Sequence, residues 1–180
     1  MQQQRFFVGH DPDAFRVALA DADAAFISYV SRTDSYHRVP GDTTALHELT
    51  RWVELKHQKC SDRGLLRWVR WTPATRQTPQ SWETVDVMAE SGGEAALILE
   101  KTGAQPLVTM PVECEHYAYG HLDVHFEVTT NGCYALITVD PDPLGRASSP
   151  LHRELRRKLQ LTGRKPQPPL QWALRPAASL

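Results

Sequence analysis

The stretch HLDVHFEVTTNGCYALITVD, residues 121–140, decides the prediction of fold class. Two runs in which apolar and polar residues alternate flank Asn131-Gly132, and this dipeptide between alternating runs is a strong signal for a tight hairpin turn. If these two residues occupy the centre of the turn, Phe126 pairs with Ile137 across the hairpin. One face of the hairpin is then wholly apolar, which predicts an antiparallel sheet that buries this face in the core.

The opposite face of the hairpin carries imidazole and carboxylate side chains, which are ligands of Zn²⁺, Mn²⁺ and Fe²⁺. In the same register Asp123 lies opposite Asp140, and two such carboxylates repel each other unless water, a proton or a cation relieves the repulsion. The candidate metal ligands are His121, Asp123, His125 and Asp140. Because residues on one face of a strand are about 7 Å apart, a site also needs a ligand from a neighbouring strand, for which His116 and Glu115 are nearest. The polar outer face of a half-exposed sheet explains the same residues without any metal.

Further elements are predicted outward from this hairpin. Residue types that favour an extended chain predict strands over residues 5–8, 65–71 and 106–114. Apolar residues that recur at helical spacing, most of them behind an N-cap residue, predict helices over residues 11–31, 42–60, 82–89, 94–101 and 150–159. The predicted fold class is therefore α+β: a single domain, mainly an antiparallel sheet, with about four to five helices packed on one face.

Length and composition are those of one ordinary globular domain. The 180 residues are 41% hydrophobic and 23% charged, and a chain of this size buries roughly 70% of its unfolded surface, which is enough for one core. Four prolines near the C-terminus prevent the last helix from continuing. We therefore predict a single α+β domain over residues 1–161 and a Pro-rich tail over residues 162–180.

The net charge of −1 conceals segments of opposite sign. Residues 1–50 carry −3, residues 51–80 carry +5, residues 81–145 carry −10 and residues 146–180 carry +7. Such segments either neutralise one another in the fold or form separate surfaces for charged partners. The near-zero total excludes a uniformly basic coat protein and a disordered acidic chain.

Basic and aromatic side chains alternate in the first basic segment, and basic side chains line one side of the last predicted helix. Such residues stack on bases and contact phosphates, or bind acidic proteins. The same residues also fit a strand with core tryptophans and a helix whose basic side chains pack within the fold. The candidate binding residues are Arg63, Arg67, Trp68, Arg70, Trp71, Arg153, Arg156, Arg157 and Lys158.

The sequence contains no complete catalytic motif: it has no phosphate-binding P-loop, no dinucleotide fingerprint, no CxxC pair and no nucleophile elbow. The leading hypothesis is a non-catalytic cytoplasmic binding protein, an adaptor or regulator without a cofactor, which engages an acidic protein or a nucleic acid. The alternative is a metal-dependent hydrolase that uses Zn²⁺, Mn²⁺ or Fe²⁺ on the polar hairpin face.

A reducing cytoplasm is the expected location of the chain. Its three cysteines are an odd and widely spaced set, namely Cys60, Cys114 and Cys133. No apolar run approaches the length that spans a bilayer, and the first residues lack the pattern of a signal peptide. We therefore expect no membrane partner.

Overall fold

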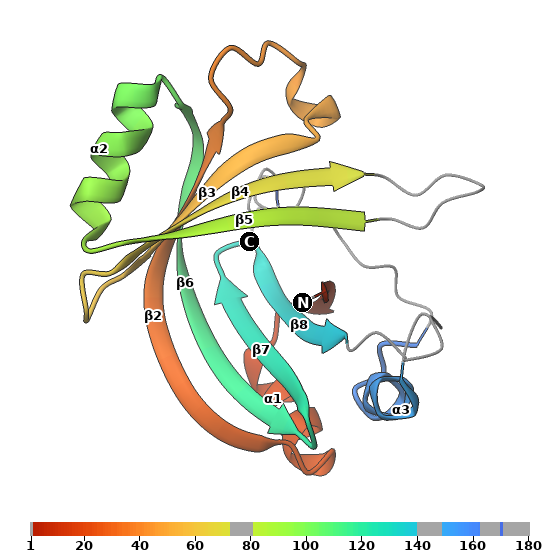
Figure 1. Cartoon of the computed structure of the whole chain (residues 1–180). Coiled ribbons are helices and arrows are strands. Elements are labelled where there is room, and N and C mark those ends of the chain that lie inside the picture. Colours follow the sequence, from red (N-terminus) through yellow and green to blue (C-terminus); the bar gives the residue numbers. More distant parts are fainter. Residues whose placement is uncertain (1, 73–80, 140–148, 163–169, 171–180) are drawn as a thin grey trace. The chain divides into compact units, whose positions relative to one another are not determined.

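The computed structural model describes residues 2–72, 81–139, 149–162 and 170. Strands dominate it (Figure 1), and they follow the order β1-β8-β7-β6-β2-β3-β4-β5 in one sheet. The strands are β1 (Gln2–Gly9), β2 (Ala25–Arg38), β3 (Arg51–Gln58), β4 (Gly64–Thr72), β5 (Ser81–Ala89), β6 (Gln105–Tyr119), β7 (Leu122–Thr129) and β8 (Gly132–Val139). The helices are α1 (Pro12–Asp21), α2 (Gly92–Thr102), α3 (Pro150–Lys158) and the single 3-10 turn η1 (Leu46–Glu48).

The chain forms two compact units. Unit 1 comprises residues 1–30 and 113–180, and unit 2 comprises residues 31–112. The two longest strands, β2 and β6, contribute to both units, since the boundaries at residues 30 and 112 fall within them. Each unit has its own apolar core, and the two units are described separately below.

The prediction of four to five helices packed on one face is wrong, because the described residues contain three α-helices and eight strands. The helices predicted over residues 42–60 and 82–89 are strands β3 and β5, and the predicted helix over residues 11–31 ends early. In β3 one face carries apolar residues, whereas the other face carries Trp52, Glu54 and Lys56. Because Trp52 adds an apolar side chain to this second face, the period-2 alternation is short, and the same residues also fit helical spacing.

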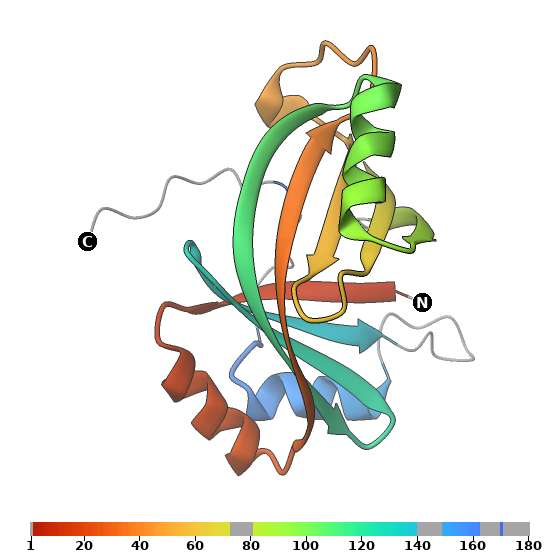
Figure 2. The same cartoon turned by 90° about the vertical axis from the view of Figure 1, so that its left-hand side faces the viewer.

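Unit 2 buries its apolar face against α2. This helix contacts β3 and β4 (Figure 2). The core of unit 2 consists of Val53, Leu55, Leu66, Ala95, Leu99 and Ala104. Gly64 allows the close approach, because a Cβ atom at this position would lie 3.1 Å from the Ala95 Cβ atom. The side chain of Ser91 caps the first turn of α2, and Gly103 ends the helix with a φ of 78°.

Unit 1 buries the apolar face that the hairpin sequence predicts. Phe126 and Ile137 are both 0% exposed, and they pack with residues of α1 and α3 in one cluster. The predicted pairing is wrong by two residues: Phe126 lies opposite Ala135, and Thr129 lies opposite Gly132. A shift of two residues keeps every side chain on its face, so the prediction of which residues share a face is correct.

The structure tests little of the predicted domain organisation. The predicted tail over residues 162–180 lies outside the described residues, apart from Thr162 and the buried Leu170. The boundary between a domain over residues 1–161 and this tail therefore stays a prediction. Among the described helices, none is both long and apolar enough to cross a membrane.

Candidate functional site

One sheet face of unit 2 is lined by charged side chains, whereas the face that packs against α2 is apolar. Asp34 of β2 lies opposite Lys56 of β3, and Glu54 of β3 lies opposite Arg67 of β4, which in turn lies opposite Asp86 of β5. Residues directly opposite one another share a face of the sheet. We call this surface the charged face and define it as Arg32, Asp34, Glu54, Lys56, Arg67 and Asp86.

A buried carboxylate organises the β2 side of the charged face. Arg32 donates from Nε and Nη2 to the two carboxylate oxygens of Asp34, at 2.7 Å and 3.0 Å. Lys56 Nζ lies 4.0 Å from Asp34 Oδ2 and 3.9 Å from Glu54 Oε2. The ammonium group of Lys56 is therefore shared between two carboxylates, neither of which holds it at hydrogen-bond distance.

The β4 side of the charged face holds a second two-pronged ion pair. Arg67 donates to the carboxylate of Asp86 at 2.8 Å and 2.7 Å. These hydrogen bonds raise the pKa of Arg67 and lower the pKa of Asp86. Asp86 is the accessible carboxylate of this face, because its side chain is 40% exposed, whereas those of Asp34 and Glu54 are 0% and 4% exposed.

A hydrogen bond from Trp52 fixes the orientation of Glu54. Trp52 is fully buried and donates from its indole Nε1 to Glu54 Oε1 at 2.9 Å. The charged face thus holds three cations and three carboxylates, and all of them except Asp86 are at low exposure. Desolvated ion pairs stabilise a fold little better than apolar side chains of the same volume. A face of this kind is therefore a candidate for ligand binding.

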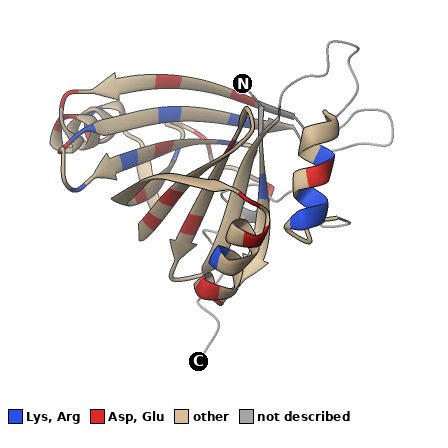
Figure 3. Cartoon of the chain, turned by 90° about the horizontal axis from the view of Figure 1, so that it is seen from below, with Lys and Arg blue, Asp and Glu red and all other residues tan. Residues whose placement is uncertain are grey.

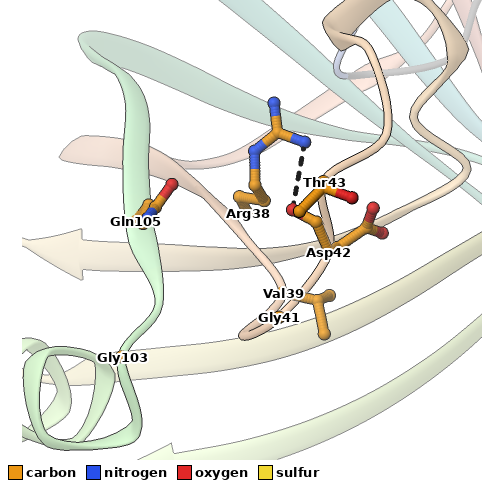
Figure 4. Close-up of a pocket in the computed structure, with 7 residues that line it drawn as sticks. All are labelled: Arg38, Val39, Gly41, Asp42, Thr43, Gly103 and Gln105. Carbon is orange, nitrogen blue, oxygen red and sulfur yellow. Dashed lines mark hydrogen bonds between the residues drawn. The ribbon is translucent and has the colours of Figure 1, made fainter.

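A polar pocket lies at the end of β2 in the same unit (Figure 4). Its volume is about 300 Å³, and it is lined by Arg38, Val39, Gly41, Asp42, Thr43, Gly103 and Gln105. Arg38 donates to the carbonyl oxygens of Asp42 and Thr44, and hydrogen bonds from Thr44 lower the pKa of the Asp42 carboxyl group. Since alternate residues of a strand share a face, Arg38 extends the row that begins at Arg32.

Unit 1 contains a second cluster of functional groups on the polar side of its hairpin. The rings of His116 and His125 stack with their centroids 4.7 Å apart and an angle of 4° between their planes. His116 Nε2 lies 3.0 Å from Asp123 Oδ1, and Cys114 Sγ lies 3.9 Å from His125 Nδ1. We call Cys114, His116, Asp123 and His125 the histidine cluster.

Three of the four predicted metal ligands lie in the described residues. His121 is exposed at the turn between β6 and β7, whereas Asp123 and His125 are half-buried on β7. Asp140 lies outside the described residues. Within residues 2–72, 81–139 and the described parts beyond, no three His, Cys, Asp or Glu side chains are arranged as metal ligands. The structure adds His116, which the sequence indicated as the nearest donor on a neighbouring strand, and Cys114, which it did not.

The basic-aromatic run of the sequence divides between two faces of β4. Arg67 belongs to the charged face, and Trp71 lies on the same side by alternation. Trp68 lies on the opposite side and packs against the core under α2, and Arg70 lies 3.6 Å from Glu83. Arg63 is exposed between β3 and β4.

Helix α3 carries several basic residues (blue in Figure 3), and their side chains have different environments. The guanidinium group of Arg156 lies 4.8 Å from the ring centre of Phe6, and Lys158 donates to the carbonyl oxygen of Ala22. Arg153 and Arg157 are exposed. The helix therefore uses part of its charge in packing within unit 1 and leaves two basic side chains at the surface.

Sequence reasoning missed most of the charged face. Glu54 and Lys56 were set aside because the segment over residues 42–60 was predicted as a helix, and Asp86 lies in the predicted helix over residues 82–89. Arg32 and Asp34 follow the predicted helix over residues 11–31 and were not candidates. The signal that was present is the alternation of Trp52, Glu54 and Lys56 with apolar residues, which is also the pattern of a strand with one charged face.

Comparisons with known proteins identify a shared fold. No protein-family model matches the chain, and no curated protein is similar to it in sequence. A conserved hypothetical protein from Pyrococcus furiosus has a similar structure, with 13% identity, coverage of 95% of this chain and 99% of that one, and a TM-score of 0.74.

Two further structures carry names that describe an activity. A candidate adenylate cyclase from Vibrio parahaemolyticus has 14% identity, coverage of 95% of both chains and a TM-score of 0.61. A candidate adenylyl cyclase from Hippeastrum, described as having a dominant triphosphatase activity, has 10% identity, coverage of 88% of this chain and 87% of that one, and a TM-score of 0.58. At these identities the similarity establishes the fold alone.

Proposed function

We propose that the chain binds a triphosphate-bearing ligand together with a divalent cation on the charged face of unit 2. The observation that carries the proposal is the arrangement of Arg32, Lys56 and Arg67 side by side with Asp34, Glu54 and Asp86. The fold shared with a protein that has a dominant triphosphatase activity supports the same ligand class.

The balance of charge favours a ligand that carries both signs. A bare triphosphate would meet three carboxylates beside the three cations, and a bare metal ion would meet three cations beside the carboxylates. A complex of the two offers phosphate oxygens to the guanidinium and ammonium groups, and a cation to the carboxylates. The low exposure of the Lys56 and Arg67 side chains strengthens the contacts to phosphate, since these contacts act away from bulk water.

The residues of the charged face fit a magnesium ion that the ligand itself carries. Mg²⁺ is usually held by one or two carboxylates together with substrate phosphates and water, and not by a cage made of protein alone. Asp86 is the carboxylate placed for this role, because its side chain is the most exposed of the three. The ion would supply neutralisation of phosphate charge.

The cations of the charged face differ in what they offer a phosphate group. The planar guanidinium group of Arg67 donates two hydrogen bonds to the carboxylate of Asp86. The same geometry fits a phosphate group, so phosphate competes with Asp86 for these donors. The ammonium group of Lys56 is a compact positive charge that lies about equally far from the carboxylates of Asp34 and Glu54. Arg32 holds the buried carboxylate of Asp34 in place through two hydrogen bonds.

The two hypotheses from the sequence stay open beside this proposal. A non-catalytic adaptor would use the exposed basic residues, and the metal-dependent hydrolase would use the polar hairpin face of unit 1. Both differ from the present proposal in the residues that they require, because neither uses Lys56 or the carboxylates of the charged face.

Calorimetric titration of the full chain with inorganic triphosphate, diphosphate and phosphate tests the proposal. We expect one triphosphate to bind per chain in the presence of Mg²⁺, and phosphate to bind at least about 10-fold more weakly. A charge-assisted hydrogen bond contributes about 1.5 to 3 kcal/mol, so Arg67→Met weakens triphosphate binding by about 10- to 100-fold.

Arg70→Met is the matched control, because it removes the same charge three residues away on the opposite face of β4. It leaves triphosphate affinity unchanged. Equal losses in the two variants, or no triphosphate binding by the wild type, would contradict the proposal. Release of phosphate from triphosphate, measured on the same samples, determines whether binding leads to hydrolysis.

A further inference from the structure

We propose that two copies of this chain pair through strand β5, antiparallel and about a two-fold axis at Val85. β5 lies at one end of the strand order and pairs with β4 on one side. Among the strands that the structure describes, none pairs with its other side, which we call the outer edge. The proposal concerns assembly of the chain and involves no ligand, so it goes beyond the function proposed above.

The side chains of β5 are exposed along the strand. Every residue over 83–88 is exposed, and Val85 and Val87 reach 64% and 46%. These two valines lie opposite Trp68 and Leu66 of β4, which belong to the apolar cluster under α2. The apolar face of unit 2 therefore continues to the outer edge, where its last side chains are open to solvent.

The outer edge lacks the features that prevent a strand from pairing further. Exposed edge strands of monomeric proteins usually carry lysine, proline or a bulge. Residues 81–89 contain neither Lys nor Pro, and their register with β4 has no shift along its length. By contrast, β1, at the other end of the strand order, has a register shift between Phe7 and Gly9. The outer edge of β5 is therefore suited to accept another strand through its backbone donors and acceptors.

The sequence of β5 fits a second copy of itself. Val85 is the central residue of Ser81–Ala89, so an antiparallel pair with Val85 opposite its own copy gives every residue of both strands a partner. In this register Glu83 and Asp86 lie opposite uncharged residues. A pair centred on Asp86 would place two carboxylates directly opposite each other, which is unfavourable. Two-fold pairing of identical strands also closes the assembly at two chains.

The charges of β5 favour a second copy over a basic partner. Arg70 Nη1 lies 3.6 Å from Glu83 Oε2, and Arg67 Nη2 donates to Asp86 Oδ2 at 2.7 Å. Both carboxylates of the strand are thus paired with arginines of their own chain. The outer edge therefore needs no basic residues from a partner, and an uncharged strand with a valine at its centre meets its requirements.

Sedimentation equilibrium of the full chain over a series of concentrations, without triphosphate or Mg²⁺, tests the proposal. We expect reversible dimers with twice the mass of one chain. Val85→Lys brings two ammonium groups together at the axis and weakens dimerisation at least about 10-fold. Val17→Lys is the matched control, because it makes the same change at a 60% exposed valine of α1 in unit 1, and it leaves dimerisation unchanged.

Oxidative cross-linking tests the register. The Cα atoms of opposed residues in an antiparallel pair lie about 4.5 to 5.5 Å apart, within the range that a disulfide bridges. In a Cys60→Ser background, which removes the exposed native thiol, Val85→Cys therefore forms a covalent dimer with the thiol oxidant diamide. Met88→Cys in the same background does not, although Met88 is 65% exposed, because its two copies lie about 20 Å apart along the pair.

Circular dichroism of each variant checks that it folds, and if Val85→Lys does not fold, the cross-linking of Val85→Cys provides the test. The proposal is overturned if the wild type is monomeric at every concentration, or if Val85→Lys dimerises as well as Val17→Lys. Cross-linking of Met88→Cys as efficient as that of Val85→Cys would overturn it as well. Because mass and cross-linking are measured without ligand, these results are independent of the proposed function.

Discussion

Replacing Glu127 with alanine is expected to lower the free energy of unfolding by about 3 to 5 kcal/mol. Arg5 of β1 forms an ion pair with Glu127 of β7, and both side chains are nearly inaccessible, at 4% and 2% exposure. Removal of the carboxylate takes this partner away from a guanidinium group that is nearly inaccessible to solvent. The loss of a partner is more costly than the loss of the pair, because the remaining charge stays desolvated.

Chemical denaturation of Glu127→Ala, of Arg5→Met and of the double variant Arg5→Met/Glu127→Leu measures this effect. We expect the double variant to recover most of the stability that the single Glu127→Ala variant loses, because no buried charge then remains at this pair. A double variant as unstable as the single one would show that the ion pair is not the source of the loss.

Replacing Phe126 with alanine is expected to cost about 3 to 5 kcal/mol of unfolding free energy, since it removes burial and leaves a cavity. The ring of Phe126 is 0% exposed, and its centre lies 4.9 Å from that of Phe15 on α1. It therefore joins the hairpin to the helix that covers it within unit 1.

Phe26→Ala is the matched control, because it makes the same chemical change at a side chain that is 57% exposed. We expect it to cost less than about 1 kcal/mol, since little burial is lost. A denaturation midpoint that moves equally in the two variants would contradict the assignment of Phe126 to the core.

The hairpin was predictable from the sequence because its two strands are apolar on one side and polar on the other. Alternation around Asn131-Gly132 is a local signal, and it placed Phe126 and Ile137 on the buried face correctly. The pairing of these residues was not predictable, because the chain turns at Thr130-Asn131, with Gly132 at a φ of 122° opposite Thr129. Either turn keeps the same residues on the core face, so hydrophobicity cannot distinguish between them.

The charged face was not predictable, because it lacks a local signal like that of the hairpin. In β3 the side chains of the charged face are charged or aromatic, and the apolar residues of this segment, together with those that precede it, fit helical spacing. The other charged side chains near Glu54 come partly from β2 and β4. No local sequence pattern connects Asp34 to Lys56 or Glu54 to Arg67. Only the order of the strands brings these charges together.

The charged face of unit 2 is the central claim, and Asp86 provides its most direct test. In the proposed function, this carboxylate competes with phosphate for Arg67 when no metal is present, and it binds the divalent cation of the ligand when metal is present. Asp86→Asn therefore affects the two conditions in opposite directions. The measurement is the calorimetric affinity of this variant for inorganic triphosphate, with and without Mg²⁺, relative to the wild type.

Without Mg²⁺ the account predicts about 10-fold tighter binding by Asp86→Asn, because Arg67 is released from its carboxylate. With Mg²⁺ it predicts about 10-fold weaker binding, because one oxygen ligand of the ion loses its charge. A change of the same sign in both conditions, or a wild-type chain that binds no triphosphate with Mg²⁺, would contradict the account.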